Sequence, residues 1–146
     1  TPMKYLDEPI FVLTCDNVVE LNFAELNNDY IDKGSPPCMV VPVKPVEGLG
    51  GDYIFHENNN IKQLTRDKKS DLYCSGIQIL NPHTINTKVS SCEKFYQVWS
   101  QLINMKQLYC SSVMPKKWYA VDNLAQLHAI NQEDWIIRLI NYIFNA

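Results

Sequence analysis

The sequence predicts an α/β fold, in which a Rossmann-like mixed sheet with flanking helices forms three layers. Two observations favour this fold. Short apolar runs are separated by segments whose apolar residues recur at helical spacing, and the chain has no internal repeat or low-complexity linker. Its 146 residues, 46% hydrophobic and 20% charged, are typical of a globular protein. We therefore expect residues 1–146 to form a single domain.

The first elements have the order strand, helix, strand. Residues 10–13 form a continuous apolar run, which predicts a strand covered on both faces, as in a parallel sheet. Asn22 and Glu25 form a capping box, and apolar residues at helical spacing continue until Gly34. A second β-branched run follows at residues 38–43. This stretch has the size of a right-handed crossover.

The rest of the chain alternates strands and helices. Gly76 interrupts one apolar strand, where a glycine often marks a bulge or the close approach of a ligand. Ser90 and Glu93 form a second capping box ahead of a helix. In order, we expect a hairpin with arms at 52–56 and 61–65, a strand at 72–80, a helix ending near 103, strands at 107–113 and 118–121 that close the sheet, a helical stretch at 124–130 and a terminal helix at 131–146.

Charge and cysteine content exclude several classes of protein. Thirteen Lys and Arg against sixteen Asp and Glu give a net charge of -3 without a dense basic run, so nucleic acid is not an expected partner. No apolar stretch approaches the ~20 residues of a membrane-spanning helix. The five cysteines are an odd number without a Cys-x-x-Cys pair, which indicates reduced thiols, mostly in the core, and a cytoplasmic location.

Two aspartates follow predicted strands. Asp16 lies just past the first strand and Asp122 just past the last one. Open α/β sheets bind ligands outside the carboxyl ends of their strands, so both carboxylates are candidates for one cleft, where they suit a hard cation such as Mg²⁺. Alternatively, each aspartate only caps a turn, and position alone favours this second interpretation.

The order and spacing of four segments resemble the sugar-phosphate nucleotidyltransferase family, which is also called the nucleoside-diphosphate-sugar pyrophosphorylase family. The segments are Phe11-Val12-Leu13-Thr14-Cys15-Asp16-Asn17, Val40-Val41-Pro42-Val43, Tyr73-Cys74-Ser75-Gly76-Ile77-Gln78-Ile79-Leu80 and Trp118-Tyr119-Ala120-Val121-Asp122. The resemblance extends over most of residues 8–128. It implies a Rossmann-like mixed sheet and transfer of a nucleotidyl group from a nucleoside triphosphate to a sugar 1-phosphate, giving a nucleotide-sugar and pyrophosphate.

The resemblance also implies roles for individual residues. Asp16 and Asp122 match the two aspartates that hold Mg²⁺ in the family. Ser75 and Gly76 match the pair that lines the sugar pocket. Gly51 resembles a glycine whose backbone contacts the sugar, although a plain loop glycine is an equal alternative. Where the family has Glu-Lys-Pro, this chain has Arg66-Asp67-Lys68-Lys69, so either Lys68 or Lys69 is the candidate phosphate ligand.

Departures from the family pattern lead to a second hypothesis. Cys15 replaces a glycine beside the nucleotide path, and the Gly-Thr that follows the second aspartate in the family is missing. A Gly-rich phosphate loop is also missing, so we expect the chain to be the carboxyl-side portion of a longer enzyme and inactive alone. The alternative is a catalytically impaired domain that senses sugar nucleotides or contacts another subunit. Homo-oligomers are compatible with either function.

Overall fold

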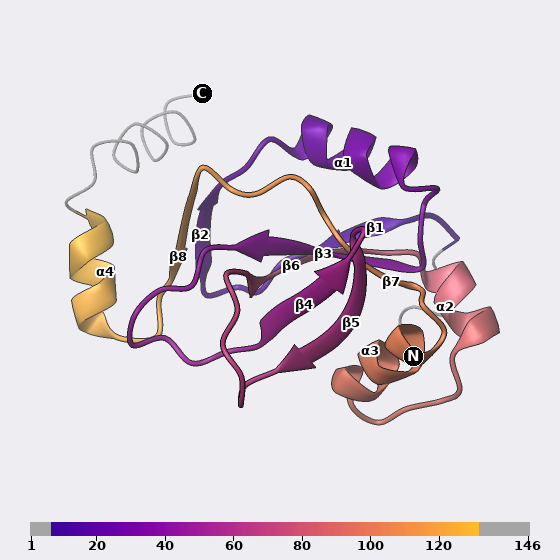
Figure 1. Ribbon diagram of the computed structural model, residues 1–146. Coiled ribbons are helices and arrows are strands. Elements are labelled where there is room, and N and C mark those ends of the chain that lie inside the picture. Colours follow the sequence, from indigo (N-terminus) through magenta and orange to yellow (C-terminus); the bar gives the residue numbers. More distant parts are fainter. Residues whose placement is uncertain (1–6, 132–146) are drawn as a thin grey trace.

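The computed structural model describes residues 7–131, which form a mixed sheet with helices on both faces (Figure 1). The predicted terminal helix at 131–146 lies outside the described residues, except for Asn131, which ends α4. The elements are, in order, β1 (Ile10–Val12), β2 (Asn17–Glu20), α1 (Phe23–Asp32), β3 (Cys38–Val43), β4 (Tyr53–Glu57), β5 (Asn60–Thr65), β6 (Tyr73–Leu80), α2 (Pro82–Lys88), α3 (Phe95–Asn104), β7 (Leu108–Cys110), β8 (Lys117–Ala120) and α4 (Leu124–Asn131).

The main sheet has six strands in the order β1-β6-β3-β7-β5-β4. Strand β3 lies parallel to β7 and antiparallel to β6, and β1 pairs antiparallel with the far side of β6. The β4–β5 hairpin contacts β7 near one end and the start of β6, at Tyr73, near the other. The predicted strand, helix, strand unit is present as β1, α1 and β3, but strand β2 comes between β1 and α1 in the chain, and β6 lies between β1 and β3 in the sheet.

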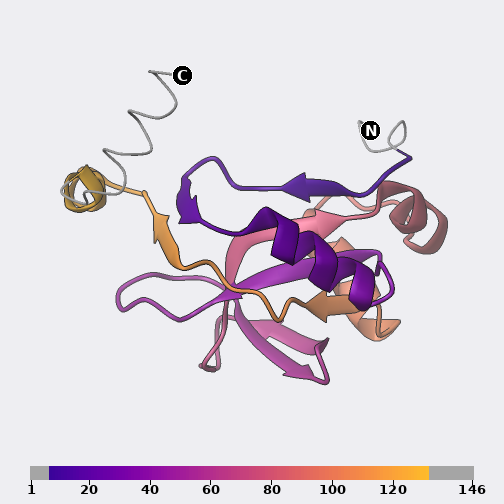
Figure 2. The ribbon, with the colours of Figure 1, turned by 90° about the horizontal axis from the view of Figure 1, so that it is seen from above.

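The core has two parts, one on each face of the sheet. On one face, Leu26 and Tyr30 of α1 pack with apolar residues of β3 and β6. On the opposite face, Ile85 of α2 and Leu102 of α3 pack with β3, β5 and β7. Figure 2 shows α1 lying over the sheet when the molecule is viewed from above. The three predicted layers are therefore present.

Strand β3 is covered on both faces, whereas β1 is not. Cys38 and Val40 point into the α3 side of the core, and Met39 and Val41 point into the α1 side. In contrast, β1 is an antiparallel edge strand, and Phe11 remains 40% exposed. The prediction that residues 10–13 form a strand buried on both faces was therefore wrong. A short apolar run does not reveal whether it lies inside a sheet or at its edge.

The helices begin and end for local reasons that the sequence shows only in part. Asn22 caps α1 by accepting a hydrogen bond from the Glu25 amide, as predicted, and Gly34, with φ of 79°, follows its end. The predicted start of α3 was wrong, because Lys94 is its N-cap. The Ser90 amide instead donates to the side chain of Gln101. Helix α2 was not predicted, although Asn81 followed by Pro82 is a typical helix start.

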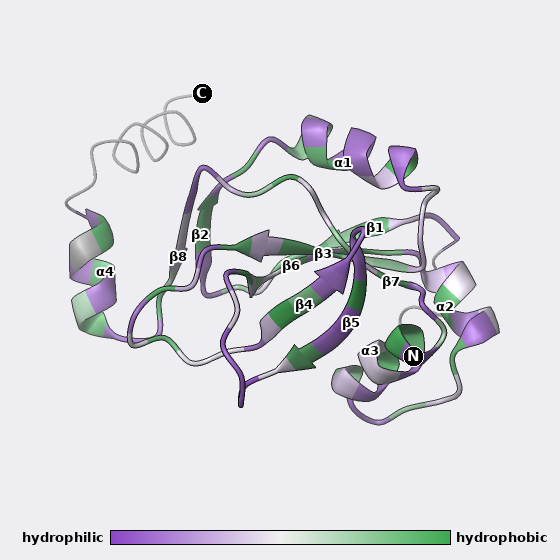
Figure 3. Cartoon of the chain, in the orientation of Figure 1, coloured by the Kyte–Doolittle hydropathy of each residue, from purple (hydrophilic) through white to green (hydrophobic). Residues whose placement is uncertain are grey.

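The distribution of hydrophobic residues follows the packing of the helices on the sheet. Figure 3 shows α1 with mostly hydrophilic residues, as expected for a helix with one face on the sheet and the other in water. No helix within residues 7–131 is long and apolar enough to cross a bilayer. Most of the five cysteines were predicted to lie in the core. Cys38 and Cys110 are buried, Cys74 and Cys92 are partly buried, and Cys15 is exposed.

Strands β2 and β8 form a separate two-stranded ribbon, which the sequence did not predict. Asn17 pairs with Ala120, and Glu20 pairs with Lys117. Strand β8 was expected to close the main sheet, and that expectation was wrong. With four residues in each strand, the ribbon gives only a weak periodic signal in the sequence. It brings residues near the amino end of the described chain beside residues near its carboxyl end.

A bulge in β6 joins this ribbon to the main sheet. The β3–β6 register shifts between the pairs Val40–Gln78 and Pro42–Cys74, so that Val41 lies opposite residues 75–77. Gly76 has φ of +82°, a conformation that other residues adopt only with strain. A Cβ at this position would lie 2.5 Å from Thr14 Oγ1. Gly76 was predicted to mark either a bulge or the close approach of a ligand. The bulge is present, and the group close to Gly76 is the chain's own Thr14, so the approach of a ligand stays a prediction.

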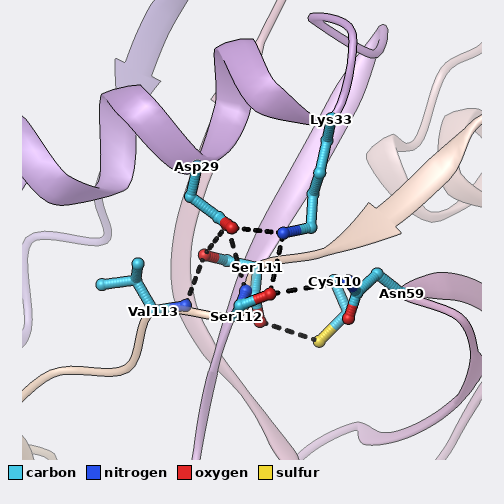
Figure 4. Close-up of polar contacts among 7 residues, drawn as sticks. All are labelled: Asp29, Lys33, Asn59, Cys110, Ser111, Ser112 and Val113. Atoms are coloured by element: carbon cyan, nitrogen blue, oxygen red, sulfur yellow. Dashed lines mark hydrogen bonds and ion pairs between the residues drawn. The ribbon is translucent and has the colours of Figure 1, made fainter.

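A nearly buried ionic network fastens α1 to the segment that leads from β7 to β8 (Figure 4). The Asp29 carboxylate accepts hydrogen bonds from the Ser111 hydroxyl at 2.7 Å and from the Ser112 amide at 3.0 Å, and it pairs with Lys33. Lys33 also donates to the Ser112 hydroxyl. Burial raises the pKa of Asp29, but the hydrogen bonds from Lys33, Ser111 and Ser112 outweigh it, so the pKa lies below its ordinary value.

We expect Gly76→Ala to destabilise the fold by about 2 kcal/mol or more, because the new Cβ adds a collision with Thr14 to the strain of a positive φ. Gly48→Ala is the matched control, since Gly48 has φ of +79° with nothing within 4 Å. Urea unfolding of both variants measures the two losses. Equal losses would show that the contact with Thr14 costs nothing.

We expect Asp29→Asn to lower the free energy of unfolding by about 2 kcal/mol at neutral pH, because Lys33 loses its charged partner. The lowered pKa means that the ionised carboxylate contributes stability above its unfolded pKa of about 3.9, and that this contribution disappears as the pH falls through the folded value. The gap between wild type and variant should therefore shrink below about pH 4. Denaturant unfolding across pH tests this, with exposed Asp32→Asn as the control. A gap that stays constant down to pH 2 would contradict it.

Candidate functional site

A cavity of about 270 Å³ lies where the β2–β8 ribbon meets the bulge of β6 and the loop before β4. Most of its wall is polar or aromatic. The lining residues are Thr14, Asp16, Asn17, Leu49, Gly50, Gly51, Asp52, Arg66, Tyr73, Cys74, Ser75, Gly76, Trp99, Trp118, Ala120 and Asp122. Five of the predicted site residues, Asp16, Gly51, Ser75, Gly76 and Asp122, are among them.

The ribbon brings the two predicted metal ligands to this cavity. The last pair of the ladder is Asn17–Ala120, and beyond it the Val121 amide donates to the Asp16 carbonyl at 2.9 Å. Asp16 and Asp122 therefore flank the same end of the ribbon. Both side chains are exposed and line one cavity. Among the described residues, neither carboxylate accepts a hydrogen bond or pairs with a cation, so both are available to a ligand.

The turn after Asp122 is held by other side chains. The Gln126 side-chain oxygen accepts from the amides of Asp122 and Asn123, at 2.7 and 3.1 Å. Asn123 caps the start of α4 by accepting from the Gln126 amide at 3.0 Å. The Asp122 carboxylate is therefore not the cap of α4. This weakens the interpretation of Asp122 as a simple turn residue.

Ser75 maintains the bulge through hydrogen bonds of its hydroxyl and its carbonyl. Its hydroxyl donates to the Val41 carbonyl at 2.7 Å and accepts from the Ile77 amide at 3.1 Å. Its carbonyl accepts from the side chains of Asn17 and Trp118. The hydroxyl is buried and engaged within the protein, so a contact between Ser75 and a sugar remains a prediction.

Gly51 lies under an aromatic ring. A Cβ at Gly51 would lie 2.3 Å from the Tyr73 hydroxyl oxygen, so this position excludes any larger residue unless Tyr73 moves. The Tyr73 hydroxyl donates to the Leu49 carbonyl at 3.1 Å, and burial raises the pKa of Tyr73. The missing side chain at Gly51 therefore makes room for another part of the chain, and a contact between its backbone and a sugar stays a prediction. The group that approaches Gly51 closely is Tyr73.

The lysines of the 66–69 stretch do not line the cavity. Lys68 Nζ lies over the Phe55 ring, 4.9 Å from its centroid. Neither Lys68 nor Lys69 belongs to the lining, so their role as phosphate ligands remains a prediction. The stretch instead contributes Arg66, whose Nε donates to Asp52 Oδ1 at 3.3 Å. Sequence reasoning did not select Arg66, because the family pattern directs attention to lysine.

Other cavity residues were also missed. Asn17 and Trp118 donate to a single acceptor, the Ser75 carbonyl, and so join the ribbon to the bulge. Both belong to segments that carry the family resemblance, yet nothing in their spacing indicates a shared acceptor. Tyr73 makes an edge contact with Trp118, their ring centroids 6.4 Å apart. These contacts join residues far apart in the chain, which no local pattern encodes.

The charge balance of the cavity favours a cation. Asp16, Asp52 and Asp122 line it, and Arg66 is the one Lys or Arg in the lining among the described residues. Burial raises the pKa of the Cys74 thiol, so this cysteine stays neutral and adds no charge. Within residues 7–131 there is no cluster of three or more His, Cys, Asp or Glu side chains able to hold a metal. The donor set of Asp16 and Asp122 fits Mg²⁺, which commonly takes one or two carboxylates and completes its shell with water and substrate phosphates.

A second cavity, of about 210 Å³, adjoins the first one across Trp118. It shares Leu49, Trp118 and Ala120 with the first cavity and extends to Gln126 and Ile130 of α4. Its described lining includes no charged side chain. Of these two cavities, the first therefore has the charged groups that metal binding or phosphate chemistry requires.

Comparisons with known proteins identify the fold. No protein-family model matches the chain, and no curated protein matches it by sequence. Solved structures do match. A putative glucose-1-phosphate thymidylyltransferase from Bacillus anthracis, in complex with sucrose, has a TM-score of 0.68 at 10% identity, covering 86% of this chain and 54% of that one.

Two further structures agree with this match. The inositol-1-phosphate CTP transferase from T. maritima has a TM-score of 0.62 at 10% identity, covering 84% of this chain and 53% of its own. Apo-UDP-glucose pyrophosphorylase has a TM-score of 0.61 at 14% identity, covering 90% and 56%. The chain thus spans about half the length of these enzymes. It has the nucleotidyltransferase-type fold that they share.

Proposed function

We propose that this chain is the sugar-phosphate half of a nucleotidyltransferase, which transfers a nucleotidyl group from a nucleoside triphosphate to a sugar 1-phosphate and releases pyrophosphate. The observation that carries the proposal is the convergence of Asp16 and Asp122 on one cavity through the β2–β8 ribbon. The fold shared with three enzymes that are named for this kind of chemistry supports it.

Asp16 and Asp122 would hold Mg²⁺ in this proposal. The ion, when bound, neutralises negative charge on the phosphates during in-line displacement at the α-phosphorus. The two carboxylates come from segments fixed by the same ladder, so their separation is set by backbone pairing. The other cavity residues position the acceptor. In such reactions, orientation of the reactants and electrostatic stabilisation of the transition state supply most of the rate enhancement. The mechanism needs no covalent intermediate on the protein.

The proposed enzyme needs more chain than these residues. The matched structures are nearly twice as long as the part that this chain covers. The described residues include no Gly-rich loop leading into a helix, the arrangement that gathers triphosphate oxygens at a helix amino end. We therefore assign nucleotide binding to the remainder of the enzyme, and metal and sugar-phosphate binding to this chain.

A second candidate function is a domain that binds sugar nucleotides without catalysis or contacts another subunit. The placement of Lys68 and Lys69 outside the cavity favours it, since the family's phosphate lysine then has no direct equivalent. Pyrophosphate release separates the two candidates. A full-length protein that releases pyrophosphate when given sugar 1-phosphates and nucleoside triphosphates is an enzyme, whereas binding without release indicates the sensor.

We expect Asp16→Asn and Asp122→Asn each to weaken Mn²⁺ or Mg²⁺ binding at least about tenfold, because each change removes a charged oxygen ligand. Calorimetric titration of the chain measures the affinity, and pyrophosphate release by the full-length protein measures turnover. Asp71→Asn is the matched control, since Asp71 is exposed and lies outside the cavity lining. Metal-dependent turnover that survives either cavity substitution would remove that aspartate from the proposal.

A further inference from the structure

Arg66 is the positive charge at the candidate site. It lines the cavity from the end of the β4–β5 hairpin, and the other charged side chains in the described lining are aspartates. Its side chain is 72% exposed, so its guanidinium reaches open solvent at the rim of the cavity. A guanidinium has five N–H donors. The single hydrogen bond that Arg66 makes within residues 7–131 uses Nε, which leaves the four terminal donors for a ligand.

Asp52 holds this guanidinium at the rim. The distance from Arg66 Nε to Asp52 Oδ1 is 3.3 Å, and the Asp52 side chain is only 19% exposed. Asp52 lies directly before β4 and Arg66 directly after β5. The two strands are antiparallel partners, and their pair Tyr53–Thr65 places Asp52 and Arg66 side by side. Asp52 is therefore a fixed partner that limits the positions of a long, exposed side chain.

The cavity needs such a cation if its ligand is anionic. Three carboxylates face it, and an incoming phosphoryl group is repelled by them unless positive charge compensates. A guanidinium also matches phosphate in shape, because its planar fork donates two parallel hydrogen bonds to two phosphate oxygens. Lys68 is held over the Phe55 ring and lies outside this lining.

We propose that Arg66, oriented by Asp52, anchors the phosphoryl group of the acceptor sugar phosphate in this cavity. This inference rests on the proposed function and assigns its acceptor subsite. Arg66 binds the acceptor, and Asp52 is a positioning residue that acts through Arg66. The role passes from a lysine later in the 66–69 stretch to the arginine at its start.

The test measures ligand binding through the fluorescence of Trp99 and Trp118, which both line the cavity. Glucose 1-phosphate, inorganic phosphate, unphosphorylated glucose and a nucleoside triphosphate are the probes, each with Mg²⁺ present. The variants are Arg66→Gln and Arg66→Lys. Lys62→Gln is the matched control, since Lys62 is an exposed lysine of strand β5 in the same hairpin and lies outside the cavity lining. Urea unfolding of each variant confirms that the fold is intact.

We expect Arg66→Gln to weaken binding of glucose 1-phosphate and inorganic phosphate about tenfold, because it removes a charge-assisted pair of hydrogen bonds. Arg66→Lys should restore part of the loss by returning the charge without the fork. Binding of glucose and of the triphosphate should not change, and the Lys62→Gln control should bind phosphate as the wild type does.

Four outcomes would overturn the inference. These are wild-type phosphate affinity in Arg66→Gln, an equal loss for unphosphorylated glucose, a loss confined to the triphosphate, and no phosphate binding by the wild-type chain. Pyrophosphate release by the full-length protein tests the proposed function separately. If phosphate binding depends on Arg66 but no pyrophosphate is released, the anion site stands and the nucleotidyl transfer fails.

Discussion

The pairing of β2 with β8 is the contact on which the candidate site depends. Asp16 and Asp122 belong to distant parts of the sequence, and this short antiparallel ladder brings them to one cavity. A two-stranded ribbon is marginally stable alone, so it must be supported by other parts of the fold. The support comes from the Ser75 carbonyl, which accepts hydrogen bonds from Asn17 of β2 and Trp118 of β8. One backbone oxygen in the main sheet thus holds both strands of the ribbon.

That carbonyl is available only because β6 is irregular at this point. In a regular ladder the backbone groups of residues 75–77 would pair with β3, whereas here the register shift separates them from it. The Ser75 hydroxyl takes over a lost ladder contact, and Gly76 supplies the unusual backbone angle. The same irregularity forms one wall of the cavity. The fold and the candidate site therefore depend on the same bulge. At two of the three glycines that line the cavity, Gly51 and Gly76, side chains of the chain itself occupy the space that a Cβ would need.

The sequence predicted the features that depend on local patterns. The hairpin, the cap of α1 and the interruption at Gly76 each follow from a few neighbouring residues, and the fold class follows from the order of such local patterns along the chain. It did not predict the edge position of β1, the ribbon or the role of Ser75, because these depend on partners far along the chain. Arg66 was missed for a related reason. The twist of the β4–β5 hairpin and the place where it ends decide which residue of the 66–69 stretch faces the cavity. Composition does not encode this. The roles of Asp16, Asp122, Lys68 and Lys69, the cytoplasmic location and any homo-oligomer remain predictions.

The β2–β8 ribbon also has a consequence for how the molecule assembles. Its two strands are separated by nearly the whole described chain, so the conformational entropy of a very long loop must be lost before they meet. Hairpins and single helices form without that cost. We therefore expect the ribbon to form late in folding, after β6 and its bulge provide the Ser75 carbonyl as a hydrogen-bond acceptor. In a partly folded chain the two aspartates would be separate surface charges, and the proposed cation site would exist only in the completed molecule.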